Sequence, residues 1–197
     1  MKRTHPKVFT GLGCMPGEYE IKLREDVTPF NLTTSRRIPI PLQPRVETKL
    51  KRTADMGVIE KVVQPMEWCF PVVVIPKKDG KVRVCGDVIQ LNKAVLWENH
   101  PMPTTEQTLA KLVGAKFFYK QDANLRFWQR KISVNSKPLT TFITTWERYC
   151  YRWLPCGISS APDHFLKIMQ KILAGLEGVD CQTDDILVFE DAHEQRA

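Results

Sequence analysis

The chain has 197 residues, with 29 Lys and Arg against 22 Asp and Glu, and a formal net charge of +7. With 43% hydrophobic and 26% charged residues, it has the composition of a globular protein, which excludes general disorder. No apolar run approaches the roughly 20 residues that span a bilayer, and no apolar stretch follows the basic start, so we expect neither a membrane protein nor a secreted one. The basic excess favours a polyanionic partner such as nucleic acid; a merely soluble basic surface is the alternative.

Prolines dominate the first part of the sequence. Six of the fourteen prolines fall within residues 1–44, and proline both fixes its own φ and disfavours helix in the residue before it. We therefore predict an extended proline-rich arm over residues 1–43, with at most a short strand around Tyr19 to Leu23. A second region, residues 44–197, would form the folded domain.

A helix is predicted to begin near Pro44, because proline suits the first helical turn. Val46, Leu50 and Ala54 would share one apolar face of this helix, and Gly57 would end it. Two valine-rich segments follow, residues 72–75 and 82–85, with Asp79-Gly80 between them. Asp-Gly between β-branched runs is the strongest short-range signal of a β-hairpin.

Two more helices are predicted further along the chain. The first covers residues 104–113, with Thr104 and Gln107 as a capping box, and its apolar face would consist of Leu109, Leu112 and Val113 before Gly114 ends it. The second begins near Ala161 and carries an apolar stripe of Phe165, Ile168, Met169, Ile172, Leu173 and Leu176.

Strands are predicted over residues 117–122 and 139–143, and over 179–189 as two strands broken at residues 183–185. Strands and helices thus alternate irregularly, and hairpins join the strands. This pattern indicates an α+β fold rather than a doubly wound parallel sheet.

The six cysteines and four histidines show no metal-binding pattern. The cysteines are scattered without a C-x-x-C pair, and most lie beside apolar or aromatic residues. Small buried thiols are therefore expected rather than disulfides. The histidines are too dispersed for a zinc site.

Three carboxylates are candidates for metal chemistry. Asp184-Asp185 lies at a predicted hairpin tip before a fully apolar strand, and Asp122 ends another apolar strand. Carboxylates between buried strands are costly unless they are neutralised, and Mg²⁺ prefers such hard oxygen ligands. With the third carboxylate on a neighbouring strand, the set would form a two-metal site. The alternative is that the Asp pair simply forms a turn.

Positive charge gathers at the valine-rich hairpin and near the first helix. Lys77, Lys78, Lys81 and Arg83 surround Asp79, so this hairpin can close over a triphosphate or hold a template backbone. Ordinary lysine protection of a sheet edge is the alternative. Six further cations enclose a single glutamate and indicate either a phosphate-facing patch or a solvated helix face: Arg36, Arg37, Arg45, Lys49, Lys51 and Arg52.

Five motifs occur in an order that is specific in combination, although each is weak alone. They are Trp68–Asn92 with its hairpin VVVIPKKDGKVRVCGD, His100–Leu112, Lys120–Gln129 with KQDAN, Leu139–Phe165 with LPCGISSAP, and QTDDILV at Gln182–Val188. In this order they resemble the reverse transcriptase domain of gypsy-type LTR retrotransposon Pol polyproteins. The resemblance extends over about residues 5 to 193. It implies the fingers and palm of a right-hand polymerase, with a mainly antiparallel palm sheet packed on helices and no thumb.

The resemblance also implies residue roles. Asp122, Asp184 and Asp185 would be catalytic and would hold two Mg²⁺ ions, for which Mn²⁺ is a possible substitute, with the carbonyl of Ala123 as a further ligand. The nucleotide-binding residues would be Lys77 and Arg83 on the phosphates, Ala123, Phe127 excluding a ribose 2′-hydroxyl, and Cys156. Lys78, Asp87 and Asn92 would brace the fingers and template.

The implied activity is RNA-directed DNA synthesis, in which a nucleotide is transferred from a dNTP to the 3′-hydroxyl of a primer. The partners would be an RNA or DNA template-primer and dNTP, without a membrane or a small-molecule cofactor. We expect an intracellular location, in the cytoplasm, a virus-like particle or the nucleus. Nothing in the sequence indicates the oligomeric state.

Departures from the family pattern limit the expected activity. Leu125-Arg126 replaces two small residues, and Arg126 would add bulk and charge at the floor of the nucleotide site. Thr145-Trp146-Glu147 replaces a Pro-Phe-Gly turn, and Arg130-Lys131 replaces an apolar-Pro step. The sequence stops after the Asp-Asp hairpin, before the thumb and the RNase H region of such polyproteins. We therefore expect this chain alone to be inactive or nearly so; the alternative function is a degenerate, catalytically inactive nucleic-acid-binding remnant.

Overall fold

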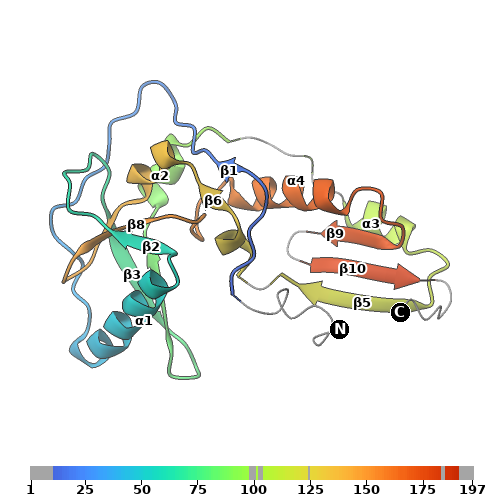
Figure 1. Ribbon diagram of the computed structural model, residues 1–197, viewed down its shortest axis with the longest axis horizontal. Coiled ribbons are helices and arrows are strands. Elements are labelled where there is room, and N and C mark those ends of the chain that lie inside the picture. Colours follow the sequence, from blue (N-terminus) through green and yellow to red (C-terminus); the bar gives the residue numbers. More distant parts are fainter. Residues whose placement is uncertain (1–10, 98–100, 102–103, 124, 183–184, 191–197) are drawn as a thin grey trace. The chain divides into compact units, whose positions relative to one another are not determined.

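The computed structural model describes residues 11–97, 101, 104–123, 125–182 and 185–190 (Figure 1). It divides into two compact units: unit 1 comprises Met1–Leu96 and Phe127–Ser159, and unit 2 comprises Trp97–Arg126 and Ser160–Ala197. Both units mix helices with strands, and most strand pairs are antiparallel, as the sequence predicted. No helix among the described residues is long and apolar enough to cross a membrane.

Unit 1 is built on a five-stranded sheet with the order β2-β8-β7-β3-β4. Its strands are β2 (Ile59–Lys61), β3 (Phe70–Pro76), β4 (Val82–Gly86), β7 (Phe142–Ile143) and β8 (Arg148–Tyr151). The β3–β7 pair is parallel and the other pairs are antiparallel. β3 and β4 form the predicted hairpin, with Val73 opposite Cys85 and Pro76 opposite Val82.

Two helices accompany this sheet. α1 (Gln43–Asp55) begins with proline in its first turn, as predicted, and it buries Val46, Leu50 and Thr53. Gly57 has φ +68° just after the helix, a conformation that favours glycine, so the predicted stop is confirmed. α2 (Ile89–Ala94) follows β4 and buries Leu91 and Ala94.

The segment before α1 is mostly extended and is tied to the rest of unit 1 by backbone pairing. Among residues 11–39 the regular structure is β1 (Glu18–Tyr19), which pairs in parallel with β6 (Lys131–Ile132), and isolated bridges at Leu23 and Asn31. η2 (Ile40–Leu42), a turn of 3-10 helix, leads into α1. Met15, Tyr19, Ile21 and Ile38 are buried, so this extended segment contributes to the core of unit 1.

The predicted strand over residues 139–143 is wrong for its first half. The chain there forms η5 (Pro138–Thr140), a second 3-10 turn after η4 (Val134–Ser136), and only Phe142–Ile143 is a strand. Proline fixes a helical φ at the start of this turn. The hydroxyls of Thr140 and Thr141 then donate to the carbonyls of Lys137 and Pro138, at 2.7 and 2.8 Å, which stabilises the turn.

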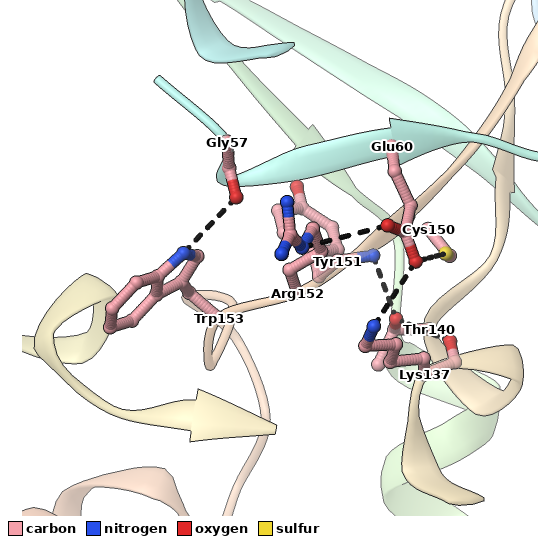
Figure 2. Close-up of polar contacts among 8 residues, drawn as sticks. All are labelled: Gly57, Glu60, Lys137, Thr140, Cys150, Tyr151, Arg152 and Trp153. Carbon is pink, nitrogen blue, oxygen red and sulfur yellow. Dashed lines mark hydrogen bonds and ion pairs between the residues drawn. The ribbon is translucent and has the colours of Figure 1, made fainter. Parts of the chain in front are cut away.

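A polar cluster under β2 and β8 joins this turn to the sheet (Figure 2). Glu60 forms ion pairs with Lys137 at 3.3 Å and Arg152 at 3.5 Å, and its carboxylate lies 3.7 Å from the Cys150 thiol. The backbone N–H of Tyr151 donates to the Thr140 hydroxyl at 3.0 Å. Glu60 on β2 is thus linked to Lys137, just before η5, and to Arg152, just after β8.

This cluster predicts that alkaline pH weakens unit 1. Burial, followed by the nearby Glu60 carboxylate, raises the pKa of Cys150 from 9.0 to about 12. The thiol ionises near pH 9 in the unfolded chain but only near pH 12 when folded, so its contribution to stability is complete below pH 9 and declines as the pH rises towards 12. Denaturant unfolding at a series of alkaline pH values should therefore show a shallower decline for Cys150→Ala than for the wild type. Cys14→Ala, at an exposed cysteine, is the control and should follow the wild type. If the free energy of unfolding fell equally steeply with pH in the wild type and in Cys150→Ala, Cys150 would not be the group responsible.

Unit 2 contains a three-stranded antiparallel sheet with the order β5-β10-β9 (Figure 1). Its strands are β5 (Phe117–Asp122), β9 (Val179–Gln182) and β10 (Asp185–Glu190), which confirms the predicted strands. The predicted break over residues 183–185 is wrong at Asp185, which already belongs to β10, and residues 183 and 184 lie outside the described residues. α4 (Ala161–Leu173) packs against β9 and buries Phe165, Leu166 and Met169. The predicted stripe of α4 extends too far, because Ile172 and Leu176 are about half exposed.

α3 (Thr105–Lys111) has the predicted capping box, since Thr104 and Gln107 each bond the other's backbone N–H. Its predicted apolar face is wrong: Thr108 is its buried residue, whereas Leu109 is 57% and Val113 83% exposed. Lys111, three residues after Thr108 and on the same helix face, forms an ion pair at 3.0 Å with the buried carboxylate of Asp180 on β9. The face of α3 that meets the sheet therefore carries Thr108 and Lys111 rather than the predicted apolar residues.

Candidate functional site

Two predicted carboxylates meet on the sheet of unit 2. Asp122 is the last residue of β5, Asp185 is the first residue of β10, and the two are direct partners in the antiparallel register. Side chains directly opposite each other in such a pair share one face, with Cβ atoms about 5 Å apart, and like charges there repel. The sequence placed Asp122 at a strand end and Asp185 at a hairpin tip, whereas the structure makes Asp185 the first residue of β10 and the partner of Asp122.

Lys120 partly neutralises this pair. Its amine lies 2.7 Å from Oδ2 of Asp185, and the hydrogen bond to Asp185, together with the charges of both aspartates, raises the pKa of Lys120. Lys120 and Asp122 are two residues apart on β5, so their side chains lie on the same face of the sheet. Sequence reasoning missed Lys120, although its place two residues before Asp122 on a strand was the available signal.

The donor set suits a hard divalent cation. The carboxylates of Asp122 and Asp185 and the carbonyl of Ala123 supply oxygen ligands, which Mg²⁺ prefers. Asp184 lies outside the described residues, and within the described part of the chain no group of three acidic, Cys or His residues could hold a metal. The described residues thus offer a carboxylate pair rather than a complete metal site, and Lys120 already supplies one positive charge to that pair.

Arg126, which the sequence placed at the floor of a nucleotide site, interacts with α4. Its guanidinium carbon lies 5.8 Å from the centre of the Phe165 ring, a cation–π distance. The preceding Leu125 has φ +52°, a left-handed conformation that costs a non-glycine residue about 1 kcal/mol. Leu125, the first departure from the family pattern, thus has a strained backbone, and the charge of Arg126, the second departure, lies against the ring of Phe165.

The basic hairpin of unit 1 has an ordered tip. The N–H of Lys77 donates to the carbonyl of Lys81 at 2.8 Å, and Gly80 has φ +76°. Lys81 forms a 3.1 Å ion pair with Asp79, which leaves Lys77 and Lys78 exposed beside it. These bonds fix the backbone of the turn, from which the side chains of Lys77 and Lys78 extend into solvent.

Lys49 on α1 and Arg83 on β4 are two further cations of unit 1 whose pKa values are shifted by their surroundings. Burial, followed by the charges of Arg52 and Lys77, lowers the pKa of Lys49, whose amine lies 5.6 Å from the centre of the Trp128 ring. The pKa of Arg83 is raised, first by a hydrogen bond to Cys85 and then by the charges of Cys85 and Cys156. Lys49, Arg52 and Lys77 therefore form one positive patch, which the sequence had divided between two separate sets.

Asp87 and Asn92 brace unit 1 internally. Asp87 forms a 2.7 Å ion pair with Arg36. Asn92 donates to the carbonyl of Gly157 at 2.8 Å and accepts from the N–H of Ser159 at 2.9 Å. Asp87 thus connects the segment after β4 to Arg36, and Asn92 connects α2 to residues 157–159.

The remaining predicted residues also lie in unit 1. Phe127 is buried in η3 (Arg126–Gln129), and Cys156 is half exposed shortly after β8. The predicted nucleotide-binding cations thus belong to unit 1, together with Phe127 and Cys156. The described carboxylates and Ala123 belong to unit 2.

The fold has counterparts among solved structures. The foamy viral protease–reverse transcriptase in complex with RNA/DNA hybrid matches 92% of this chain with a TM-score of 0.79 and 21% identity, over 24% of its own length. The foamy viral protease–reverse transcriptase dRH in complex with double-stranded DNA matches 92% of this chain with a TM-score of 0.73 and 20% identity, over 31% of its own length. The fold is therefore that of a part of the retroviral protease–reverse transcriptases.

Sequence comparison finds relatives among retroelement polyproteins. The chain is 35% identical over 194 residues to protein K02A2.6 of Caenorhabditis elegans, and 30% identical over 190 residues to the Transposon Tf2-3 polyprotein of Schizosaccharomyces pombe. It is also 36% identical over 115 residues to the enzymatic polyprotein of Cestrum yellow leaf curling virus. The chain spans 13 to 18% of the length of these relatives. No protein-family model matches it. The chain is therefore homologous to a segment of retroelement polyproteins.

Proposed function

We propose that this chain forms the fingers and most of the palm of an RNA-directed DNA polymerase of a gypsy-type retrotransposon. The observation that carries the proposal is the direct pairing of Asp122 with Asp185 at the ends of two neighbouring strands. The solved relatives named above were determined with RNA/DNA hybrid or double-stranded DNA, which supports the same class of partner here.

Each part of the proposed site has its own task. The carboxylates of Asp122, Asp184 and Asp185 and the carbonyl of Ala123 would hold two Mg²⁺ ions, which activate the primer hydroxyl and stabilise the charge on the leaving pyrophosphate. Lys77 and Arg83 would bind the phosphates of the dNTP by charge-assisted hydrogen bonds. Phe127 would exclude a 2′-hydroxyl, Cys156 would contact the nucleotide, and Lys78 would hold the template strand.

A primer-extension assay on an RNA template tests this function. We expect little or no incorporation of the complementary deoxynucleotide by this chain alone, and any incorporation seen with Mg²⁺ or Mn²⁺ should be lost in Asp185→Asn. Asp79→Asn is the matched control, because it changes a carboxylate that pairs with Lys81 at the hairpin tip. Incorporation that is unaffected by Asp185→Asn would contradict the proposed site.

A second candidate function is binding of nucleic acid without catalysis, and Arg126 favours it because a large charged residue, held against Phe165, replaces a small residue of the family pattern. This function predicts binding to an RNA–DNA duplex that weakens with salt, does not depend on Mg²⁺, and is unchanged in Asp122→Asn. Absence of incorporation together with such binding would support the second function over the first.

A further inference from the structure

A groove of unit 1 lies between the end of β2, the turn that joins β7 to β8, and the extended segment before α1. It has a volume of about 740 Å³ and is open to solvent. Its lining residues differ from those assigned to the polymerase site, and they include Thr33, Ser35, Lys61, Val63, Trp146 and Arg148. The proposed function therefore does not account for this groove.

The turn that carries Trp146 is fixed by the buried hydroxyl of Thr144. This hydroxyl donates to the carbonyl of Glu147 at 2.7 Å and accepts from the N–H groups of Trp146 and Glu147 at 3.3 and 3.0 Å. The N–H of Thr144 also donates to the carbonyl of Glu147 at 2.9 Å. These bonds hold the turn without the proline and glycine of the family pattern. The indole of Trp146, which is 41% exposed, is thus carried on a rigid backbone, which lowers the entropy cost of binding a partner.

Positive charge accompanies this ring in the groove. The amine of Lys61 lies 2.6 Å from Oε1 of Glu147, and Nη2 of Arg148 donates to the carbonyl of Val63 at 3.4 Å. The lining thus carries two cations against one carboxylate. The exposed Arg37 lies two residues after Ser35 and adds to the positive charge near the groove. The charge of the groove is therefore complementary to an anionic ligand.

The chemistry of the lining favours single-stranded nucleic acid over a protein partner. Its exposed large apolar side chains are Trp146 and Val63, which is 89% exposed, and they are too few for the apolar core of a protein interface. Lys61 at the end of β2 and Pro65 after it also discourage the addition of a further strand at this sheet edge. Unpaired bases, in contrast, stack on an aromatic ring whatever their identity, while cations contact the phosphates.

We propose that this groove binds single-stranded nucleic acid, with an unpaired base stacked on the indole of Trp146 and the neighbouring phosphates contacted by Lys61 and Arg148. Stacking and phosphate contacts need no divalent metal and read no base sequence. A base-paired duplex offers little to this ring, because its bases are stacked inside the helix. The groove adds a binding site to the proposed function and does not depend on it.

Fluorescence anisotropy of a short labelled oligothymidylate, measured with EDTA and without dNTP, tests the stacking contact. We expect Trp146→Ala to weaken binding by about 10- to 100-fold, the range for losing the stacking of one base. Trp146→Phe should retain most of the affinity, because its smaller ring still stacks. Trp97→Ala is the matched control, since Trp97 is a second exposed tryptophan and lies in unit 2. Equal affinity in the wild type and a folded Trp146→Ala would overturn the proposal.

The salt dependence of the same binding tests the phosphate contact. We expect Arg148→Gln to lower the slope of log affinity against log salt by about one phosphate contact. Lys171→Gln, which removes an exposed charge on α4 in unit 2, should keep the slope of the wild type. An unchanged slope in Arg148→Gln would contradict the role of this guanidinium.

Two comparisons separate the groove from the polymerase site. Trp146→Ala should leave the affinity for a blunt RNA–DNA duplex unchanged, and an equal loss for the duplex and the single strand would overturn the stacking contact. Trp146-dependent strand binding supports the groove whether or not the chain incorporates nucleotides. Incorporation together with equal strand affinity in the wild type and Trp146→Ala would overturn the groove and retain the polymerase function.

Discussion

Replacement of Arg130 by methionine is expected to lower the free energy of unfolding of unit 1 by about 3 kcal/mol. Arg130 is only 6% exposed, and it donates from Nη2 to the carbonyl of Glu18 at 2.8 Å and from Nη1 to the carbonyl of Pro16. Methionine fills a similar volume but donates no hydrogen bond, so both carbonyls would lose their donor. The departure at Arg130 from the apolar residue of the family is thus explained by its contact with the segment around β1.

The Arg130 guanidinium also lies beside the pair formed by β1 and β6. β1 pairs with β6 directly after Arg130, and a Cβ on Gly17, where φ is +80°, would lie 3.2 Å from Nη1 of Arg130. Loss of the guanidinium is therefore expected to loosen the β1–β6 pair as well.

Denaturant unfolding with a tryptophan signal measures this effect. Lys131→Met is the matched control, because Lys131 is exposed on the adjacent position and contacts the face of Trp153 at 5.8 Å. We expect a change of at most about 1 kcal/mol for the control. Equal destabilisation by the two variants would show that Arg130 does not anchor the β1 segment.

Arg83→Gln is expected to weaken triphosphate binding by about 10- to 100-fold, the usual range for losing one charge-assisted contact. The guanidinium is held on the hairpin strand beside Cys85 and near the positive patch of Lys49, Arg52 and Lys77. Glutamine can still form hydrogen bonds but carries no charge, so the loss in triphosphate affinity measures what the charge of Arg83 contributes to binding.

Titration with a fluorescent dNTP measures this affinity. The matched control is Lys81→Gln, which removes a charge that is already paired with Asp79 at 3.1 Å. We expect this control to retain most of the affinity. A similar loss in both variants would indicate a general effect of net charge rather than a contact made by Arg83.

Much of the fold could be predicted because local signals agreed with the final structure. Pro44 and Gly57 mark the ends of α1, and Asp79-Gly80 marks the β3–β4 hairpin. Where the prediction failed, contacts with distant residues decided the outcome. The face of α3 that meets the sheet carries Lys111, which pairs with Asp180, and Leu109 is exposed. Asp180 lies far from α3 in the sequence, so this ion pair could not be predicted.

The candidate site was predictable in composition but not in arrangement. Asp122 and Asp185 could be assigned to strand ends from their apolar neighbours, yet their register depends on the pairing of β5 with β10. Lys120 was missed because an isolated lysine on a strand resembles any exposed charge until its partner Asp185 is placed. The bracing by Asn92 required the backbone of residues 157–159, which is distant in sequence.

Electron paramagnetic resonance of Mn²⁺ in the presence of dNTP measures whether the pair of Asp122 and Asp185 binds a divalent metal. We expect bound Mn²⁺ in the wild type and in Asp79→Asn, and at least about tenfold weaker binding in Asp122→Asn. Asp122→Asn should not lower the thermal stability of the metal-free protein, because it removes the repulsion between Asp122 and Asp185. Equal Mn²⁺ affinity in the wild type and a folded Asp122→Asn would contradict the assignment of this pair as the metal site.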